Sequence, residues 1–145
     1  PFPTELNDET GNALREIGHE FGSTTGRPRR CGWLDLPALK YAIMINGVTK
    51  LFITKSDVLS GFKTIKVCTS YLLDGKECRE ISFDNSPIKP VYKELPGWEE
   101  NISAIREFSK LPENLKKYIK FIEDQTNITV KMVSVGPDRE ETIIR

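Results

Sequence analysis

Three arginines follow a run of glycine and hydroxyl residues in the first quarter of this 145-residue chain, which reads Gly22-Ser23-Thr24-Thr25-Gly26-Arg27-Pro28-Arg29-Arg30. A guanidinium group is always charged and donates paired hydrogen bonds to carboxylate or phosphate oxygens. Glycine lets the backbone approach a ligand closely and bend around it. These residue types predict a loop that binds an anion. A solvated surface loop or a nucleic-acid patch remains the alternative interpretation.

Two further polar segments follow short apolar runs: Lys55-Ser56-Asp57 and Ser134-Val135-Gly136. In open parallel sheets, ligands bind beyond the carboxyl ends of strands. An aspartate carboxylate can accept two hydrogen bonds from guanine, from N1–H and from the exocyclic amine, whereas adenine offers no such pair. A lysine stem can lie along the ring, and backbone N–H groups of the second segment can face the guanine O6. A solvated lysine beside a helix-capping aspartate remains the simpler alternative, because three residues recur by chance.

Other reactive side chains give no sign of catalysis. His19 is the only histidine, and we expect a structural role for it within a helix. The pairs Glu99-Glu100 and Glu140-Glu141 are typical of solvated charge. Trp33 and Trp98 are typical of packing. The three cysteines are widely spaced and predict reduced thiols rather than a disulfide framework or a zinc site: Cys31, Cys68 and Cys78.

The composition predicts one soluble globular domain with a real core, because 38% of the residues are hydrophobic and 29% are charged. The formal net charge is zero, so any anion-binding site must be local. No apolar run reaches the roughly 20 residues that a membrane-spanning helix needs. Because the first residue is Pro1 and not methionine, we expect a piece of a longer protein.

The hydrophobic pattern alternates between helical and extended periods. Helices are expected at about 8–21, at about 35–46 with Asp35 as the cap, and from Pro112 to about Asn127. Strands are expected at 50–54, 64–73 and 128–133, with a shorter extended piece at Val91-Tyr92. Asp74-Gly75 predicts a hairpin whose return strand passes through Ile81 and Phe83. This order predicts an α/β fold with a mostly parallel sheet, flanking helices and an inserted antiparallel hairpin.

Several of these segments, taken in order, strongly resemble the C-terminal third of the adenylosuccinate synthetases. The matching segments are Pro1–Leu6, Glu20–Asp35, Thr54–Leu59, Leu95–Trp98 and Ser134–Arg139. That family joins IMP to L-aspartate in purine biosynthesis, using GTP and Mg²⁺. GTP first phosphorylates O6 of IMP, and the aspartate amine then displaces the phosphate.

The resemblance implies a role for each loop residue. The mobile loop that grips the substrate aspartate would consist of Ser23, Thr24, Thr25, Gly26, Arg27, Pro28 and Arg29. Arg27 would also reach the ribose of IMP, and Arg29 would reach the GTP side. Guanine would be bound by Lys55, Ser56, Asp57, Ser134, Val135 and Gly136.

Two departures from the family pattern are small, and a third is large. Pro28 stands inside the arginine run, and Ser56 takes a position where an apolar residue is common. The family's glycine-rich phosphate loop, its catalytic aspartate and histidine and its magnesium ligands belong to the N-terminal two-thirds, and none of them is in this sequence. The resemblance thus implies that residues 1–145 form a single C-terminal part of a P-loop-NTPase-like fold. It would hold no catalytic residue and no metal ligand, and would be inactive alone.

The resemblance further implies that the full-length enzyme is a cytoplasmic homodimer that binds IMP, L-aspartate and GTP, without nucleic-acid or membrane partners. Two other functions stay open. One is a GTP-binding regulatory domain, because Thr54-Lys55-Ser56-Asp57 resembles the guanine motif of GTPases, although the phosphate loop is missing. The other is an RNA-binding module that uses Arg27, Arg29 and Arg30.

Overall fold

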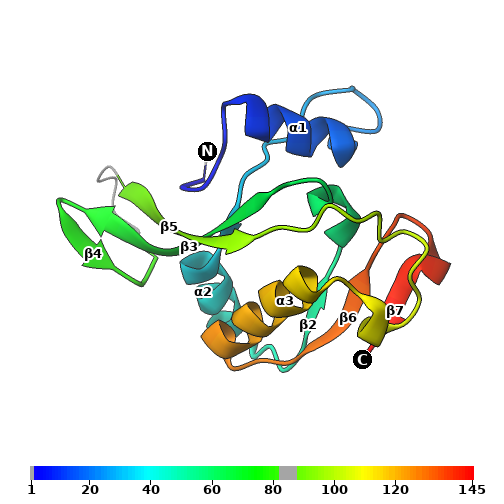
Figure 1. The fold of residues 1–145 in the computed structure, drawn as a ribbon. Helices are drawn as coiled ribbons and strands as arrows, with labels where there is room; N and C mark the ends of the chain where they lie inside the picture. Colours follow the sequence, from blue (N-terminus) through cyan, green and yellow to red (C-terminus); the bar gives the residue numbers. More distant parts are fainter. Residues whose placement is uncertain (1, 82–87) are drawn as a thin grey trace. The chain divides into compact units, whose positions relative to one another are not determined.

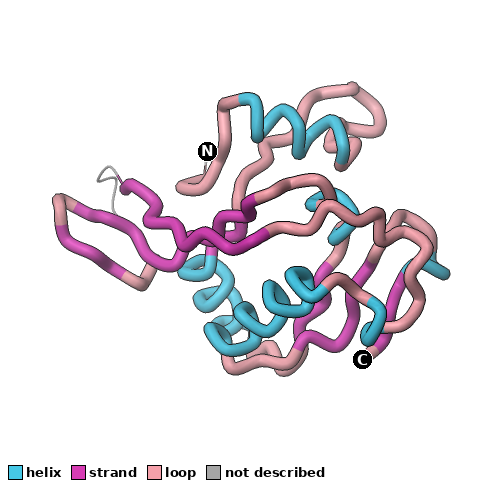
Figure 2. The backbone as a smooth tube through the Cα atoms, viewed as in Figure 1, coloured by secondary structure: helices cyan, strands magenta, loops and turns pink. Residues whose placement is uncertain are grey.

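A computed structural model describes residues 2–81 and 88–145 of the chain. Contacts divide the chain into two compact units, the first made of Pro1–Ala38 and Lys66–Lys93, the second of Leu39–Ile65 and Glu94–Arg145. Figure 1 follows the elements along the sequence, and Figure 2 separates helices from strands. In order, they are α1 (Glu9–Ile17), β1 (Leu34–Asp35), α2 (Leu36–Asn46), β2 (Leu51–Ile53), the 3-10 turn η1 (Ser56–Leu59), β3 (Thr64–Leu73), β4 (Lys76–Cys78), β5 (Ile88–Pro96), the turn η2 (Phe108–Lys110), α3 (Glu113–Thr126), β6 (Val130–Ser134), the turn η3 (Arg139–Glu141) and β7 (Thr142–Ile144).

The strands form two small sheets. In the first, β3 pairs with β1 in parallel, with β4 antiparallel, and also with β5. In the second, β6 lies between β2, which is parallel to it, and β7, which is antiparallel. The α/β class and the inserted hairpin are confirmed. The expected mostly parallel sheet is refined to two mixed sheets, because the short β3–β4 and β6–β7 connections permit only antiparallel neighbours.

The first helix is shorter than the sequence pattern predicts. Asp8 caps α1 by accepting a hydrogen bond from the Gly11 N–H at 2.9 Å. The helix ends at Ile17 instead of about residue 21, because Gly18 is its cap and His19 turns the chain away with a φ of 50°. His19 is therefore exposed beyond the helix and does not lie within it.

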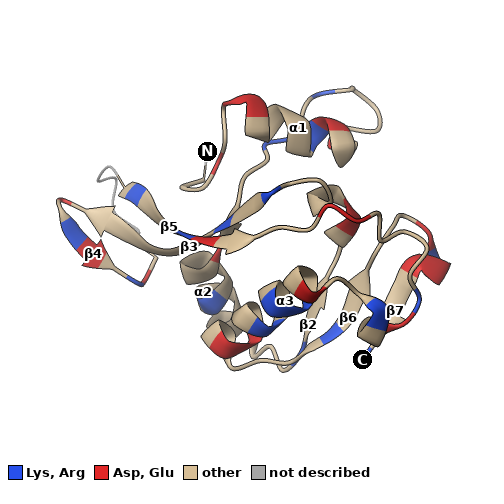
Figure 3. Cartoon of the chain, in the orientation of Figure 1, with Lys and Arg blue, Asp and Glu red and all other residues tan. Residues whose placement is uncertain are grey.

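The other two helices begin and end where their capping residues indicate. The Asp35 carboxylate accepts a hydrogen bond from the Ala38 N–H at 3.1 Å, and Gly47 follows α2 with a φ of 60°. Asn127 ends α3 in the left-handed conformation, with a φ of 57°. The apolar face of α3 is buried through Leu115, Tyr118, Ile119 and Ile122. Lysines alternate with acidic residues along its solvent side, which accounts for the mixed colours of α3 in Figure 3.

The hairpin of the first unit forms at the expected turn. Asp74 and Gly75 both have positive φ, 49° and 78°, as a two-residue turn between twisted strands requires. The return strand β4 is shorter than predicted, because strand pairing ends at Cys78 and does not extend to Ile81. Phe83 lies outside the described residues.

The C-terminal sheet is buried on one face only. Val133 of β6 and the neighbouring Ile143 of β7 are almost fully buried, whereas Ile144 is 76% exposed. The strand expected at 50–54 forms as β2, but it is not buried on both faces, because Phe52 in its middle is 62% exposed. The alternating side chains of a strand face opposite sides of the sheet, and Phe52 lies on the exposed side. The strand β7 was not predicted.

Trp98 organises the core of the second unit. It is 2% exposed, and its ring centroid lies 6.0 Å from that of Tyr118 on α3. Its indole N–H donates to the Ser60 hydroxyl at 3.2 Å, directly after η1. A side chain at the preceding Gly97 would overlap the Phe62 carbonyl, so the backbone can approach this closely only at glycine. The predicted packing role of Trp98 is confirmed.

A buried polar group lies in the first unit. The Tyr71 hydroxyl donates to the Asp35 carboxylate at 2.6 Å, and both Tyr71 and the nearby Cys68 are shielded from solvent. Burial raises the pKa of the Cys68 thiol to about 11, and the Asp35 charge adds to the increase. None of the three cysteines forms a disulfide. No described helix is long and apolar enough to cross a bilayer.

We therefore predict that Cys68 resists alkylation. At pH 8 only on the order of one in a thousand Cys68 thiols would be ionised, and the thiolate is the reactive form. Mass spectrometry after iodoacetamide treatment should find Cys31 and Cys78 modified and Cys68 intact until denaturant is added. The two half-exposed cysteines act as internal controls. Equal labelling of all three thiols in the native protein would contradict the buried polar arrangement.

Candidate functional site

The second sheet brings two of the predicted segments to the same edge. Ile53 at the end of β2 pairs with Val133 near the end of β6, and the two strands are parallel. Lys55–Asp57 follows β2, and Ser134–Gly136 follows Val133 directly. The turn η1, which contains Ser56 and Asp57, contacts β6. Two segments far apart in the sequence therefore meet at the carboxyl edge of one parallel pair, where open α/β sheets bind ligands.

Lys55 occupies an unusual backbone conformation between β2 and η1. Its φ and ψ are 57° and 39°, in the left-handed region that non-glycine residues rarely adopt. This conformation ends the strand and redirects the chain into the η1 turn. Strained residues of this kind cluster at ligand-binding positions, where the surrounding structure holds them in place.

Two polar atoms of η1 are shielded from water without a partner. Oδ1 of Asp57 and the Ser56 hydroxyl are buried, and neither forms a hydrogen bond to a described residue. A buried polar atom left without a partner costs on the order of 1–3 kcal/mol. Such atoms call for an explanation in a folded protein. A ligand that donates hydrogen bonds to the carboxylate is one explanation consistent with the place of η1 at the sheet edge.

The segment after β6 is a fixed turn rather than a flexible loop. The Ser134 hydroxyl donates to the Gly136 carbonyl at 2.9 Å, and the Val135 N–H donates to the Glu141 carbonyl at 2.8 Å. Val135 therefore cannot offer its N–H to a ligand, which corrects the expectation that several N–H groups of this segment are available. Among the described residues, the Gly136 N–H has no partner.

Glu141 is part of this turn and was missed in the sequence. Its carboxylate accepts a hydrogen bond from the Asp138 N–H at 3.0 Å, and its side chain is only 16% exposed. Together the two residues form a capping box. The interpretation of Glu140-Glu141 as solvated charge is wrong for Glu141, although Glu140 is exposed. The spacing Asp-x-x-Glu after Gly-Pro is a capping signature that could have identified it.

The arginine loop lies in the first unit and is closed by its own backbone. The Gly22 N–H donates to the Arg27 carbonyl at 2.8 Å, and the Arg29 N–H donates to the Glu20 carbonyl at 2.9 Å. Gly26 has a φ of 64° and reverses the chain at the tip. The loop thus has a hydrogen-bonded base, and every side chain from residue 23 to residue 30 is exposed.

The three arginines differ in what they contact. The Arg29 guanidinium lies 2.9 Å from the Glu20 carboxylate, and the Arg30 guanidinium lies 3.5 Å from Glu5. Arg27 forms no ion pair with a described residue. A basic surface for nucleic acid requires several unneutralised charges, so the carboxylate partners weaken that interpretation. Of the three, Arg27 is the side chain best placed to bind an added anion.

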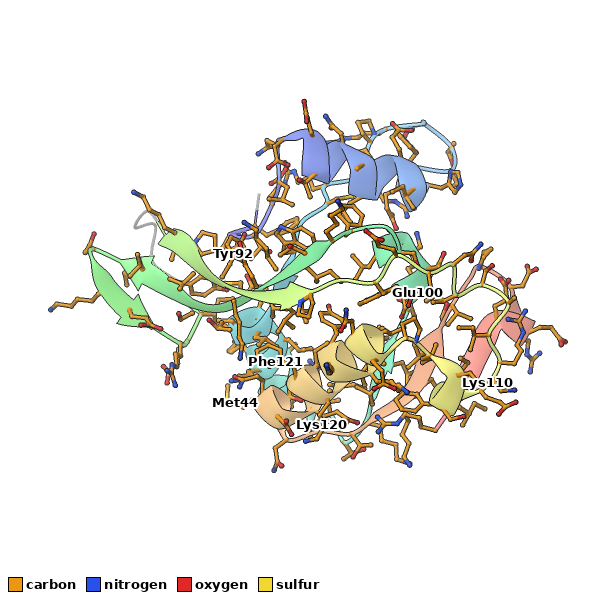
Figure 4. All side chains as sticks on the ribbon, viewed as in Figure 1. Met44, Tyr92, Glu100, Lys110, Lys120 and Phe121 are labelled. Atoms are coloured by element: carbon orange, nitrogen blue, oxygen red, sulfur yellow. The ribbon has the colours of Figure 1, made fainter. Side chains whose placement is uncertain are left out.

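Other features of the second unit carry less chemistry. A hollow of about 570 Å³ is lined by Lys63, Trp98, Asn114 and neighbouring residues, including Glu100, which Figure 4 labels. Neither Lys55–Asp57 nor Ser134–Gly136 lines it. Within residues 2–81 and 88–145, no group of three or more His, Cys, Asp or Glu side chains is arranged to hold a metal ion.

Comparison with known proteins connects this arrangement to one enzyme family. The family model described as adenylosuccinate synthetase matches residues 1–143. The chain is 53% identical to an adenylosuccinate synthetase of Bacteroides fragilis and 55% identical to that of Porphyromonas gingivalis, and each alignment covers 100% of the chain. The chain spans 34% of the length of both curated relatives.

A solved structure agrees with the fold over the whole chain. This structure of a fully ligated adenylosuccinate synthetase from Plasmodium falciparum superposes on the chain with a TM-score of 0.93 at 42% identity. The match covers 100% of this chain and 36% of that one.

The conformation of Lys55 gives a first prediction for the site. Replacement by glycine should keep or raise the thermal unfolding midpoint, because glycine removes a left-handed strain of about 1 kcal/mol. Replacement by valine should lower the midpoint, because a β-branched side chain tolerates this region least. The Asn127→Gly and Asn127→Val variants form a matched pair at another left-handed position, which ends α3. If Lys55→Val were as stable as Lys55→Gly, the backbone conformation assigned to residue 55 would be incorrect.

Proposed function

The chain belongs to the adenylosuccinate synthetase family, and we propose that it supplies the guanine-binding and aspartate-binding loops of a ligase that joins IMP to L-aspartate with GTP. The observation that carries the proposal is the meeting of Lys55–Asp57 and Ser134–Gly136 at the carboxyl edge of the β2–β6 pair. The reaction would form adenylosuccinate and release GDP and phosphate during AMP biosynthesis.

Guanine recognition would depend on Asp57. A carboxylate accepts hydrogen bonds and donates none, so it matches the guanine N1–H and exocyclic amine and rejects adenine, which has an acceptor at N1. The orphaned Oδ1 of Asp57 supports this role. The Gly136 N–H would donate to the guanine O6, and the Lys55 stem would lie along the ring. Ser56, Ser134 and Val135 would complete the walls of the base site.

Aspartate recognition would depend on the loop from Ser23 to Arg29. The substrate is a dicarboxylate, and Arg27 offers a guanidinium without a described carboxylate partner. The exposed hydroxyls of Ser23, Thr24 and Thr25 add donors, while Gly26 and Pro28 set the course of the backbone at the tip. We propose that Arg27 also contacts the ribose of IMP. Arg29 would contact the GTP side. To do so, its guanidinium must leave the ion pair with Glu20 and bind the nucleotide instead.

The residues of this chain bind and orient the reactants and do not carry out the chemical step. GTP and Mg²⁺ would supply phosphoryl transfer to O6 of IMP. Such transfer depends on metal ions and positioned charges, and the chain spans only 34% of the length of the relatives that it matches. We therefore propose that the chain has no activity alone. Cytoplasmic location, a homodimeric full-length enzyme and the absence of nucleic-acid partners belong to this proposal as well.

Exchanging the base-reading carboxylate should change nucleotide specificity. In a full-length synthetase carrying this chain, Asp57→Asn should raise the KM for GTP at least tenfold and make xanthosine triphosphate the better substrate. The asparagine carbonyl can accept from N1–H, and its amide can donate to the xanthine O2. Steady-state rates with both nucleotides at saturating IMP and aspartate measure the change.

The control is Asp74→Asn, which makes the same chemical change in the exposed hairpin turn, where Asn-Gly is as favourable as Asp-Gly. It should leave both KM values unaltered. An Asp57→Asn enzyme that still prefers GTP would show that Asp57 does not read the base.

Removing the unpaired arginine should weaken aspartate binding. Arg27→Ala should raise the KM for aspartate about tenfold or more, since hydrogen bonds to charged groups contribute about 1.5–3 kcal/mol. The KM for GTP should stay within about twofold. Initial rates over a range of aspartate concentrations provide the measurement, and Arg79→Ala, at an exposed arginine of the same unit, is the matched control. An unchanged aspartate KM would argue against the loop as the aspartate site.

A further inference from the structure

We propose that Glu141 is a positioning residue for guanine recognition, because it determines which backbone N–H of the turn after β6 can face the nucleotide. This inference rests on the guanine site proposed above. Glu141 does not follow β6 directly: it closes η3, immediately before β7. Its role would be to hold Val135, Gly136 and Asp138 in one arrangement.

Glu141 contacts the turn through both its backbone and its side chain. The Glu141 carbonyl accepts the Val135 N–H at 2.8 Å, and the Glu141 carboxylate accepts the Asp138 N–H at 3.0 Å. The Glu141 N–H in turn donates to the Asp138 carbonyl at 2.9 Å. Pro137 has no N–H to donate. Of the four residues from 135 to 138, only Gly136 keeps an N–H without a partner among the described residues.

The carboxylate also lies close to the backbone of Gly136. A Cβ atom built on Gly136 would overlap Oε2 of Glu141. The carboxylate therefore occupies the space that a side chain at position 136 would need, and it lies against the backbone whose N–H remains unpaired. Gly136 does not have a positive φ, and any side chain at this position would require the Glu141 carboxylate to move.

A second contact keeps the carboxylate in place. The Arg106 guanidinium lies 3.8 Å from Oε1 of Glu141 and also donates to the carbonyls of Ser103 and Ile105. One carboxylate oxygen thus faces the Asp138 N–H, and the other faces a fixed cation. With its side chain only 16% exposed, Glu141 is held more firmly than a solvated surface glutamate would be.

Loss of Glu141 should weaken the contact to one atom of the base, the purine O6. If Glu141 directs the Gly136 N–H toward O6, its removal should affect any purine that has O6 and should not change the discrimination made at the 2-amino group. Guanine and hypoxanthine share O6 and N1–H and differ only in that amine. GTP and inosine triphosphate should therefore respond equally to a change at Glu141.

The test uses a full-length synthetase carrying this chain. Glu141→Ala should raise the KM for GTP and for inosine triphosphate by the same factor, about tenfold, which corresponds to one lost hydrogen bond of about 1.4 kcal/mol. The KM values for IMP and aspartate and the kcat should stay within about twofold. Glu141→Gln should restore the native GTP KM to within about threefold, because the amide oxygen can still accept the Asp138 N–H.

Two further variants keep the test decisive. Glu140→Ala removes the exposed neighbour in the same turn and should leave all constants unaltered. If Glu141→Ala fails to fold, Glu141→Asp preserves the charge but shortens the side chain, and it should raise both nucleotide KM values together. An unchanged GTP KM in the folded Glu141→Ala or Glu141→Asp enzyme would overturn the inference. So would a Glu141→Gln enzyme as impaired as Glu141→Ala.

The outcome for Asp57→Asn separates this inference from the proposed function. If Asp57→Asn shifts preference toward xanthosine triphosphate while the Glu141 variants leave the GTP KM unchanged, only the role of Glu141 fails. If Asp57→Asn has no effect on preference, the guanine site itself is misplaced.

Discussion

The parallel pairing of β2 with β6 is the interaction on which the rest of the site depends. It aligns Ile53 with Val133 and thereby sets Lys55–Asp57 beside Ser134–Gly136. A shift of one residue in this register would exchange the two faces of β2 and move the η1 turn away from the end of β6. The buried Val130 and Val133 stabilise the pairing from the core side of β6. The chemistry at the edge therefore depends on apolar packing beneath it.

The two proposed binding segments use different physical strategies. The turn after β6 has almost all its backbone hydrogen bonds satisfied internally, so it can present one N–H in a fixed direction. The arginine loop has a fixed base and an exposed tip, and its specificity would come from long charged side chains. A rigid backbone suits a flat base whose edge has one pattern of donors and acceptors. Adaptable side chains suit a small dicarboxylate that must be surrounded.

Capping and turn residues gave the most accurate predictions from the sequence. Asp35 and Asn127 identified helix ends, and Asp74-Gly75 identified the hairpin, because each acts through its own backbone conformation or a nearby N–H. The segments that would bind guanine were found from their position after apolar strands. The strand β7 and the role of Glu141 were not predicted. The strand β7 has only three residues, too few for an alternating pattern to stand out, and the capping signature from Asp138 to Glu141 was interpreted as solvated charge.

In the first helix, a local pattern predicted more helix than the structure contains. Leu14, Ile17 and Phe21 have helical spacing, but Gly18 and His19 end the helix between them. Phe21 instead forms a bridge with Pro28 at the base of the arginine loop. The apolar spacing therefore identified residues with structural roles, but Phe21 serves to close the loop and not to extend the helix.

The distance along the chain between β2 and β6 has a consequence for how the site comes into being. Leu51 pairs with Val130, so the intervening hairpin, the strand β5 and the helix α3 must all be synthesised before the parallel pair can close. Bringing Leu51 and Val130 together costs loop-closure entropy, and this cost must be met before the β2–β6 contacts themselves can stabilise the pair. The arginine loop, by contrast, closes over a few residues near the beginning of the chain. During synthesis, the segment proposed to bind aspartate can therefore fold before the β2–β6 edge that is proposed to distinguish guanine from adenine.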